Sequence, residues 1–544
     1  MLMMNRPWLS SYDEGVKSQL CYPEVCVHDL LQKKALDNGS MMAIEIGSES
    51  ITYGELETQS TNLAGNLVAL GVKKGDVVGI CMANSIPFVI AYFGILKAGG
   101  VVAAMNPAFP QRELQFQVDM TAMRLVFTTH DKTEVFLNLN PDQIMSLVIV
   151  GEAGVTENNE ACFSFDKFLK SSKEIVALPL IAPSDPAVVQ FSGGTTGTPK
   201  AAVGAHRNIV ANVIQFREWL VNLEDGKETF LVAIPLYHVY GLVLGLMLGI
   251  ATRARMIFVE HAGNVDEIID AFKRYPISYF PAVPSIFGKI NEHPDVIAKR
   301  ISLATIKACI SGSAPLMDSI RLAFETNTGG YLVEGYGLSE APTATHCNPI
   351  LGEKRSGSIG LPLPDVECKI MSMTNPAAEL GTDEEGELWI KGPQVMLGYL
   401  RRESENSVVL VDGWLKTGDI ARMDADGYFY LSGRIKELVK VHGMQVWPTE
   451  VEEVISSHPA VRECVAAGIP DRSSGERIKL WVVPQQDQSI SLQEIREFCR
   501  EKLAAYKIPV QLEIRNSIPR TPVGKILRRA LVQEHLEMEK KKRE

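Results

Sequence analysis

The chain has 544 residues, of which 46% are apolar and 22% charged, so a mostly disordered chain and a collagen-like chain are excluded. This length exceeds that of a single small binding module and accommodates a large body with a smaller second domain. The net charge of −11 disfavours nucleic acid as a partner, because phosphate backbones attract basic surfaces.

The cysteines and the apolar runs indicate a compartment. Nine scattered cysteines without a CxxC pair argue against a disulfide framework and against a zinc site, and they favour a reducing environment. The first residues lack the apolar core of a secretory signal. The longest apolar run, residues 239–251, is too short to cross a bilayer. We therefore expect a cytoplasmic protein with no transmembrane span, in which this run is a buried segment.

Helices and strands alternate in the first part of the chain. Thr52 and Glu55 have the spacing of a capping box, and leucines at helical spacing follow them. A strand at 77–82, a helix at 87–98 and a strand at 101–105 come next, an order that implies parallel pairing. Because the same alternation recurs further on, we expect an α/β fold: a large body of parallel sheets flanked by helices.

The last hundred residues differ in charge from the rest. Residues 437–544 hold 18 Lys or Arg and 16 Asp or Glu, although the whole chain is acidic. Glycine-rich polar stretches precede this segment, so we expect an N-terminal domain at 1–432, a hinge at 433–436 and a small, mobile α+β domain at 437–544. The elements predicted within it are strands at 464–469 and 479–483 and helices at 450–456, 492–503 and 526–536.

Residues 191–200 read FSGGTTGTPK and follow a predicted strand. Three glycines let several backbone N–H groups converge on phosphate oxygens, four hydroxyls donate further bonds, and a lysine adds positive charge. The GxxxxGK[ST] spacing of a Walker loop is absent, and a flexible surface loop is the alternative interpretation. The candidate phosphate-binding residues are Ser192, Gly193, Gly194, Thr195, Thr196 and Lys200.

Four more motifs follow in order: YGLSE at 336–340, WLKTGD at 414–419, GRIKE at 433–437 and PVGK at 522–525. With the glycine–hydroxyl loop, this order resembles the adenylate-forming superfamily, which includes acyl-CoA synthetases, 4-coumarate-CoA ligases and firefly luciferase. The resemblance runs from about residue 27 to residue 531. It implies an AMP-forming acid–thiol ligase that activates a hydrophobic carboxylic acid, fatty or aryl-alkanoic, with ATP and Mg²⁺. Coenzyme A then displaces AMP from the acyl-adenylate.

The resemblance also assigns catalytic roles. Lys525 matches a lysine that contacts the carboxylate and the phosphate during adenylation, although an isolated lysine would be a solvated surface charge. Glu340 matches a magnesium ligand, a role suited to a carboxylate oxygen; the alternative is a carboxylate at a helix N-terminus. His238 matches a histidine beside the substrate carboxylate, whereas a lone histidine before an apolar run is usually a core group.

Binding residues are carried over from the matching motifs. For the nucleotide, Tyr336 would stack on adenine and Asp419 would accept both ribose hydroxyls; the other expected contacts are Ser313, Ala314, Gly337, Ser339 and Arg434. The acyl pocket would be lined by Tyr240, Gly335, Thr343 and Ala344, and the glycines within 241–249 would leave room for an apolar tail. The thiol step would use Lys436 at the hinge together with Lys440, Gly443 and Gln445.

The sequence departs from the family pattern at four positions. Ser339 stands where the family often has threonine. Ala201 stands where glycine is common, and His261 and His442 stand where plant ligases have lysines that contact coenzyme A. An acyl-AMP ligase that loads the phosphopantetheine of a carrier protein is therefore an alternative. A non-catalytic nucleotide-binding protein on the same fold is another, because fold alone does not determine activity. No residue points specifically to luciferase-like oxidation.

Overall fold

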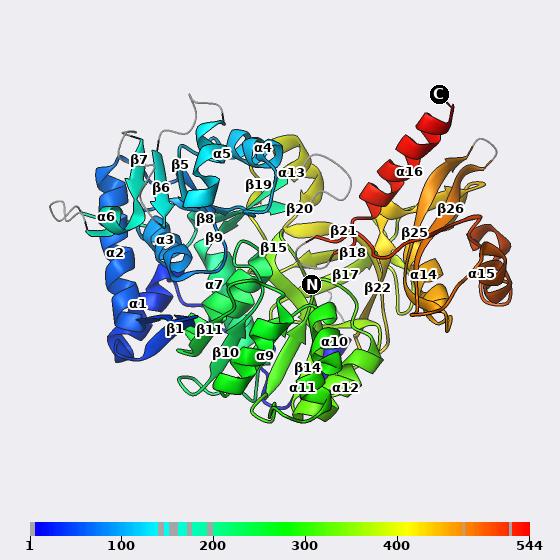
Figure 1. The fold of residues 1–544 in the computed structure, drawn as a ribbon, viewed down its shortest axis with the longest axis horizontal. Coiled ribbons are helices and arrows are strands. Elements are labelled where there is room, and N and C mark those ends of the chain that lie inside the picture. The colour runs from blue at the N-terminus through cyan, green and yellow to red at the C-terminus, as the bar shows by residue number, and fades with distance from the viewer. Residues whose placement is uncertain are drawn as a thin grey trace. The chain divides into compact units, whose positions relative to one another are not determined.

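The computed structural model describes residues 6–139, 146–151, 161–170, 177–192, 200–471, 474–521 and 525–543 (Figure 1). The chain divides into two compact units. Unit 1 contains the chain up to Gly193 together with Pro199–Glu367 and Lys391–Leu415, and unit 2 contains Cys368–Ile390 and Lys416–Glu544. Both units combine helices and sheets, so the expected α/β fold is confirmed.

One sheet of unit 1 has the order β19-β9-β8-β4-β3-β5-β6-β7. β3 and β4 are parallel, with Val77 opposite Val101, as the strand–helix–strand order predicted. β8 and β9 are antiparallel, and so are β9 and β19. The strands are β3 (Val77–Cys81), β4 (Val101–Ala104), β5 (Leu125–Thr129), β6 (Ser146–Val150), β7 (Cys162–Ser164), β8 (Pro186–Ser192), β9 (Lys200–Ala205) and β19 (Gly398–Tyr399).

Beside this sheet, α2 (Tyr53–Ala69) begins at the predicted capping box, and α3 (Ile86–Lys97) begins one residue before its predicted start at 87. Thr52 and Glu55 form the capping box of α2, and Ser85 caps α3, whose side chains are almost all buried. The remaining helices beside this sheet are α4 (Gln111–Thr121), α5 (Thr133–Leu137) and α6 (Phe165–Lys170).

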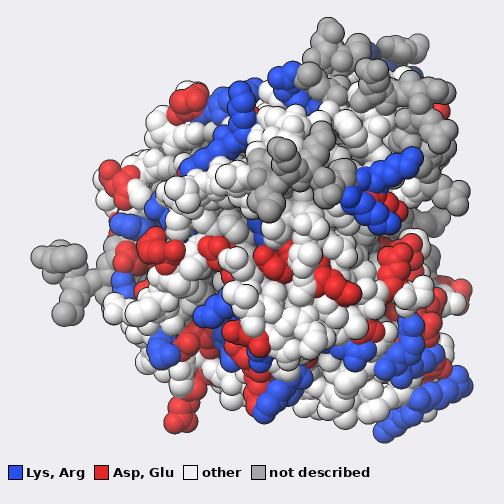
Figure 2. All heavy atoms as spheres, turned by 90° about the vertical axis from the view of Figure 1, so that its left-hand side faces the viewer, with Lys and Arg blue, Asp and Glu red and all other residues white. Residues whose placement is uncertain are grey.

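On the face that carries α1, α2 and α6, Lys and Arg side chains are interspersed with Asp and Glu (Figure 2).

The other strands of unit 1 follow the order β16-β15-β14-β13-β12-β10-β11-β1-β2. They are β1 (Met42–Ile46), β2 (Glu49–Thr52), β10 (Thr229–Val232), β11 (Arg255–Phe258), β12 (Tyr279–Ala282), β13 (Ala308–Ser311), β14 (Tyr331–Leu338), β15 (Ala341–Cys347) and β16 (Ser358–Pro362). Their helices are α1 (Val27–Asn38), α7 (His206–Trp219), α8 (Leu248–Ala251), α9 (Val265–Arg274), α10 (Pro284–Glu292), α11 (Pro294–Ile297) and α12 (Asp318–Thr328), and α13 (Glu403–Val409) follows β19.

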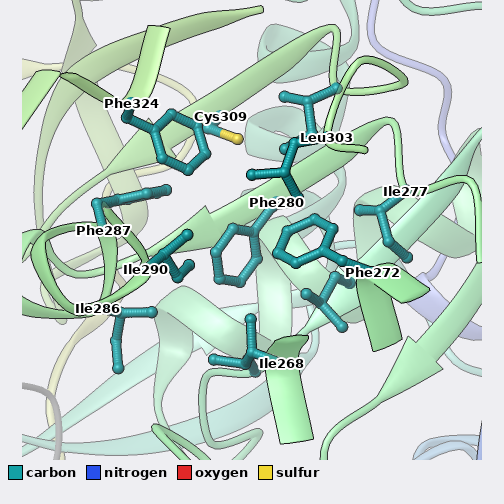
Figure 3. Close-up of a cluster of buried hydrophobic side chains, with 14 of the residues drawn as sticks. Ile268, Phe272, Ile277, Phe280, Ile286, Phe287, Ile290, Leu303, Cys309 and Phe324 are labelled. Carbon is teal, nitrogen blue, oxygen red and sulfur yellow. The ribbon is translucent and has the colours of Figure 1, made fainter. Parts of the chain in front are cut away.

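An aromatic core packs α9, α10 and α12 against this sheet (Figure 3). Phe280 of β12 lies between Phe272 and Phe287, with ring centroids 6.0 and 5.4 Å away, and Phe287 meets Phe324 at 4.9 Å. These edge-to-face contacts add to the burial of large apolar side chains. The core therefore holds the strands whose carboxyl ends carry candidate site residues.

The apolar run at 239–251 is buried as predicted, as a π-helical segment (η3, Gly241–Met247) followed by α8. A Cβ on Gly241 would lie 2.5 Å from the Pro235 carbonyl oxygen, and one on Gly249 would lie 2.5 Å from the Met256 sulfur. The expectation that these glycines leave room for an acyl tail is therefore wrong, because neighbouring chain already occupies the space. Among the described residues, no helix has the length and apolarity to cross a membrane.

Unit 2 contains two groups of strands. One has the order β17-β18-β21-β22, and the other has β24-β23-β26-β25 with β27 beside β26. The strands are β17 (Glu367–Met371), β18 (Gly386–Lys391), β21 (Trp414–Met423), β22 (Phe429–Arg434), β23 (Val439–Val441), β24 (Met444–Val446), β25 (Val461–Asp471), β26 (Gly475–Pro484) and β27 (Gln511–Ile514), and the helices are α14 (Pro448–Ser456), α15 (Leu492–Cys499) and α16 (Arg528–Arg543).

All three predicted helices of unit 2 differ in extent from the prediction. α14 begins at Pro448 instead of 450. α15 ends at Cys499 instead of 503, and α16 begins at Arg528 instead of 526 and continues to Arg543. The charged run at 540–543 thus forms the last turn of this helix. All nine cysteines lie in the described ranges, where they are free thiols.

A largely buried guanidinium connects the start of α16 to the rest of unit 2. Arg528 donates to Glu437, to both carboxylate oxygens of Glu452 at 2.7 and 2.8 Å, and to the Ala466 carbonyl at 2.9 Å. Arg528 is 14% exposed and its two acidic partners 15% and 14%. Removing one member of such a cluster leaves buried charge without compensation.

Replacing Arg528 by alanine should therefore lower the free energy of unfolding by about 3–5 kcal/mol. Arg515→Ala is the control, because Arg515 pairs with Glu513 and Glu534, which are 26% and 47% exposed, and each such exposed pair contributes about 1 kcal/mol or less. Urea unfolding of both variants measures the difference. Equal losses would show that the Arg528 cluster does not stabilise unit 2 in this way.

Candidate active site

The glycine–hydroxyl loop connects β8 to β9. Ser192 ends β8 and is paired in register with Lys200, the first residue of β9. Gly193, Gly194, Thr195 and Thr196 lie outside the described residues, as does the side chain of Ser192. Lys200 forms an ion pair with Glu405, and its ammonium lies 4.7 Å from the centre of the Tyr399 ring.

The YGLSE motif forms the end of β14 and the turn into β15. Ser339 and Glu340 occupy this turn, so the alternative that Glu340 sits at a helix N-terminus is wrong. The Tyr399 hydroxyl donates a 2.7 Å hydrogen bond to Glu340 Oε1. Among the described residues, Glu340 Oε2 has no hydrogen-bond partner. A half-buried carboxylate with one oxygen held and the other available fits a Mg²⁺ ligand.

Tyr336 and Gly337 lie in β14, opposite β15. The Tyr336 ring is 9% exposed and meets the buried His346 ring edge-on, with centroids 5.8 Å apart. Burial lowers the pKa of His346 to about 3, so this ring is neutral at physiological pH. A Cβ on Gly337 would lie 1.7 Å from the Thr343 carbonyl oxygen, so the close approach of the two strands requires glycine here.

Ser313 and Ala314 follow β13, and Ser313 has a φ of +73°. Glu334 of β14 holds this loop, since its Oε2 accepts a 2.9 Å hydrogen bond from Leu316 N–H. Burial raises the pKa of Glu334 to about 8. Glu334 therefore connects the loop that follows Ser313 and Ala314 to β14, the strand that carries Tyr336 and Gly337. No motif in the sequence indicated this role.

The predicted acyl-pocket residues come from several elements. Tyr240 precedes η3, and its hydroxyl lies 2.8 Å from the Ile310 carbonyl oxygen and 3.1 Å from that of Ala282, at the carboxyl ends of β13 and β12. A Cβ on Gly312 would lie 3.2 Å from the Tyr240 ring. Gly335 is in β14, and a Cβ there would meet Ile310 at 3.3 Å.

Thr343 and Ala344 are fixed from α7. The buried Asn212 accepts from Thr343 N–H at 2.8 Å and donates to the Ala344 carbonyl at 2.8 Å. An asparagine inside an amphipathic helix gives no sequence signal of this role, because the two strand residues lie about 130 positions away. Asn212 therefore positions Thr343 and Ala344, a role that was not predicted from the sequence.

His238 lies in the segment between β10 and η3. Asn84 supports this segment, donating to the Ile234 carbonyl at 3.0 Å and accepting from Leu236 N–H at 2.8 Å. The rings of Tyr237 and His238 have centroids 5.0 Å apart. His238 therefore lies, with Tyr240, just after the residues that Asn84 holds by these two hydrogen bonds.

In unit 2, Asp419 of β21 and Arg434 of β22 face each other in register. Arg434 Nε lies 2.8 Å from Asp419 Oδ1, and the aspartate is 4% exposed against 43% for the arginine. Thr417 Oγ1 accepts from Asp419 N–H at 3.1 Å. The structure thus brings together the two residues expected at the ribose.

The residues expected at the thiol step lie close together in sequence and in unit 2. Lys436 is exposed in the 3-10 turn Ile435–Glu437 (η4). Lys440 and Gln445 are exposed partners across the β23–β24 hairpin. His442 and Gly443, at φ +52° and +79°, form its two-residue turn, a conformation that favours glycine.

Lys525 is exposed and lies three residues before the start of α16. Its N–H donates to Thr521 Oγ1 at 3.1 Å, and its carbonyl accepts from Thr521 N–H at 2.7 Å. Residues 522–524 of the PVGK motif lie outside the described residues. Lys525 is thus exposed at the surface of unit 2.

The fold and these motifs define an adenylate-forming enzyme, and the family comparison agrees. The AMP-binding enzyme family matches residues 31–400, and the AMP-binding enzyme C-terminal domain matches residues 450–525. The chain belongs to this family. The predictions of an adenylate-forming protein and of an AMP-forming acid–CoA ligase are confirmed.

Among individual proteins, the chain is 34% identical to the long-chain-fatty-acid–CoA ligase of Bacillus subtilis (strain 168), over 98% of this chain and 99% of that protein. It superposes on ATP-bound MatB from Rhodopseudomonas palustris with a TM-score of 0.85 and 25% identity, covering 94% and 99% of the two chains. For Bacillus subtilis o-succinylbenzoate CoA synthetase with ATP and magnesium, the TM-score is 0.78 at 25% identity, covering 92% and 98%.

Glu334 should make stability depend on pH. Its pKa is about 8 in the folded protein, against an ordinary 4.5, so the folded chain keeps a proton that the unfolded chain releases between these values. The free energy of unfolding should fall as pH rises from about 5 to 8. In Glu334→Gln this contribution should disappear. Urea unfolding at pH 5.5, 7 and 8.5 should therefore show the free energy of unfolding of the variant rising, relative to that of the wild type, as pH increases.

The control for this experiment is Glu55→Gln. Hydrogen bonds from Thr52 lower the pKa of Glu55, so its titration falls below the range tested and the variant should follow the wild-type trend. A difference between Glu334→Gln and wild type that stays constant with pH would contradict the assignment.

Proposed function

We propose that this protein activates a long-chain fatty acid with ATP and Mg²⁺ and transfers the acyl group to coenzyme A. A carboxylate oxygen attacks the α-phosphorus, pyrophosphate leaves, and an acyl-adenylate forms. The coenzyme A sulfur then loses its proton, attacks the acyl carbon, and AMP leaves. The observation that carries the proposal is the 34% identity, across nearly the whole of both chains, with a protein named for this fatty-acid reaction.

The adenylation step requires positive charge between two anions. We assign Lys525 to the carboxylate and α-phosphate, and Lys200 with the residues around 192–196 to the triphosphate. Glu340 would hold Mg²⁺, which when bound neutralises phosphate oxygens. The half-buried position of Glu340 and its bond from Tyr399 support that role.

We assign different residues to the nucleotide and to the acid. Asp419 would accept the ribose hydroxyls beside Arg434, its 2.8 Å partner. Tyr336, Gly337, Ser339, Ser313 and Ala314 would border adenine. His238 would lie at the substrate carboxylate, and the acyl chain would run along Tyr240, Gly335, Thr343 and Ala344.

For the thiol step, we propose that residues 433–436 act as a hinge with Lys436 at its end. A swing of the domain at 437–544 would replace Lys525 by the face carrying Lys440, Gly443 and Gln445. The exposure of these three residues on one hairpin supports this use. Loading of a carrier-protein phosphopantetheine remains the second candidate, since His442 and the ion-paired His261 replace expected lysines.

Lys525→Ala should reduce ATP–pyrophosphate exchange by roughly 100-fold or more, because a contact made in the adenylation transition state is lost. The variant should still convert synthetic acyl-adenylate and coenzyme A to thioester, which excludes misfolding. Lys540→Ala, at an exposed lysine of α16, is the control. Near-normal exchange in Lys525→Ala would refute the role.

A panel of acids tests the substrate. Long-chain fatty acids should drive AMP release faster than acetate or aryl-alkanoic acids, because each buried CH₂ adds about 0.8 kcal/mol of binding. Free coenzyme A should accept the acyl group in preference to a holo-carrier protein. Thioester formed only on the carrier protein would favour the second candidate, and no acid-dependent exchange would favour a non-catalytic protein.

A further inference from the structure

One tyrosine contacts two motifs that lie far apart in the sequence. The Tyr399 hydroxyl donates to Glu340 Oε1 at 2.7 Å, and the face of its ring lies 4.7 Å from the Lys200 ammonium. Tyr399 is 7% exposed and the Lys200 side chain 25%, so the tyrosine is buried and the contact with Lys200 is partly shielded from water. All three residues belong to unit 1.

The backbone of Tyr399 is held on both sides. In β19 it pairs with Ala202 of β9, two residues after Lys200. Its N–H donates to Asn406 Oδ1 at 2.6 Å, and its carbonyl accepts from Asn406 Nδ2 at 2.9 Å. The ring therefore has a defined position relative to the strand on which Lys200 begins.

The turn that carries Glu340 is held to the same segment. Met396 N–H donates to the Glu340 carbonyl at 2.9 Å, three residues before Tyr399. Glu405 of α13, which follows β19, forms the ion pair with Lys200 and also lies 3.1 Å from Arg402. The segment around β19 thus contacts both the backbone and the carboxylate of Glu340, and also the charge of Lys200.

These contacts affect the orientation of the charged groups. A hydrogen bond donated to a carboxylate is stronger than one between neutral groups, and it selects one rotation of that carboxylate. A cation over a tyrosine face is attracted electrostatically by the ring. Without the hydroxyl, Glu340 Oε1 loses the hydrogen bond from Tyr399. Without the ring, Lys200 also loses its cation–π contact.

We propose that Tyr399 is a positioning residue that orients Glu340 through its hydroxyl and Lys200 through its ring for binding of the metal–nucleotide complex. The inference rests on the proposed function, because it takes Glu340 as the magnesium ligand and Lys200 as a triphosphate contact. It adds a residue outside the five sequence motifs, and it assigns the hydroxyl of this residue to Glu340 and the ring to Lys200.

Tyr399→Phe removes the hydroxyl and keeps the ring. We expect the apparent affinity for Mg²⁺ in ATP–pyrophosphate exchange to fall roughly tenfold, as for loss of one hydrogen bond to a charged group. The maximal rate at saturating Mg²⁺ should recover substantially. By calorimetry, ATP should bind more weakly to the variant when Mg²⁺ is present, and equally to variant and wild type when EDTA is present.

Tyr399→Leu removes the ring as well. This variant should bind ATP more weakly both with Mg²⁺ and with EDTA, because Lys200 loses its contact with the ring. Should the leucine variant fail to fold, the phenylalanine variant alone decides the hydroxyl's role.

Tyr275→Phe is the matched control. Tyr275 donates to Glu45 at 3.1 Å and has the Arg255 guanidinium 5.0 Å from its ring centre, so it repeats the arrangement away from the candidate site. Its Mg²⁺ dependence should equal that of the wild type. A Tyr399→Phe enzyme with wild-type Mg²⁺ dependence would overturn the inference, whereas a wild type without acid-dependent exchange would overturn the proposed function instead.

Discussion

The reaction that we propose brings two anions, a carboxylate and a triphosphate, to bonding distance. A single pair of like charges 4 Å apart costs about 1 kcal/mol in water and about 4 kcal/mol at an effective dielectric near 20, and ATP carries several charges. Cations must therefore be held where the anions meet. Lys200, Lys525 and the metal site at Glu340 are the groups that the chain offers for this, and much of the surrounding structure positions them.

The positioning relies on polar side chains inside each unit. In unit 1, Tyr399 and Glu334 connect the turn at 339–340 and the loop at 313–316 to neighbouring strands, and Asn212 fixes Thr343 and Ala344. In unit 2, Arg528 joins the start of α16 to Glu437 and Glu452. A buried polar group must find partners, and each of these groups finds them in segments distant in sequence.

Close backbone approach is the second means of positioning. Gly337 lets β14 and β15 meet where a side chain would overlap the Thr343 carbonyl, and Gly312 leaves room for the Tyr240 ring. The glycines of 241–249 likewise bring η3 and α8 against Val232, Pro235 and Met256. Their spacing suggests free volume when read as sequence, but in the fold that volume is filled by neighbouring atoms.

Local patterns in the sequence determined the elements and the family. Capping at Thr52, the apolar strands predicted at 77–82 and 101–105 and each of the five motifs involve residues close together along the chain, so the α/β fold and the adenylate-forming class could be predicted. Tertiary structure decided the turn that holds Glu340 and the roles of Tyr399, Glu334 and Asn212. The hydrogen bonds through which they act join residues 18 to 132 positions apart, and the chain brings these residues together only when its sheets have formed.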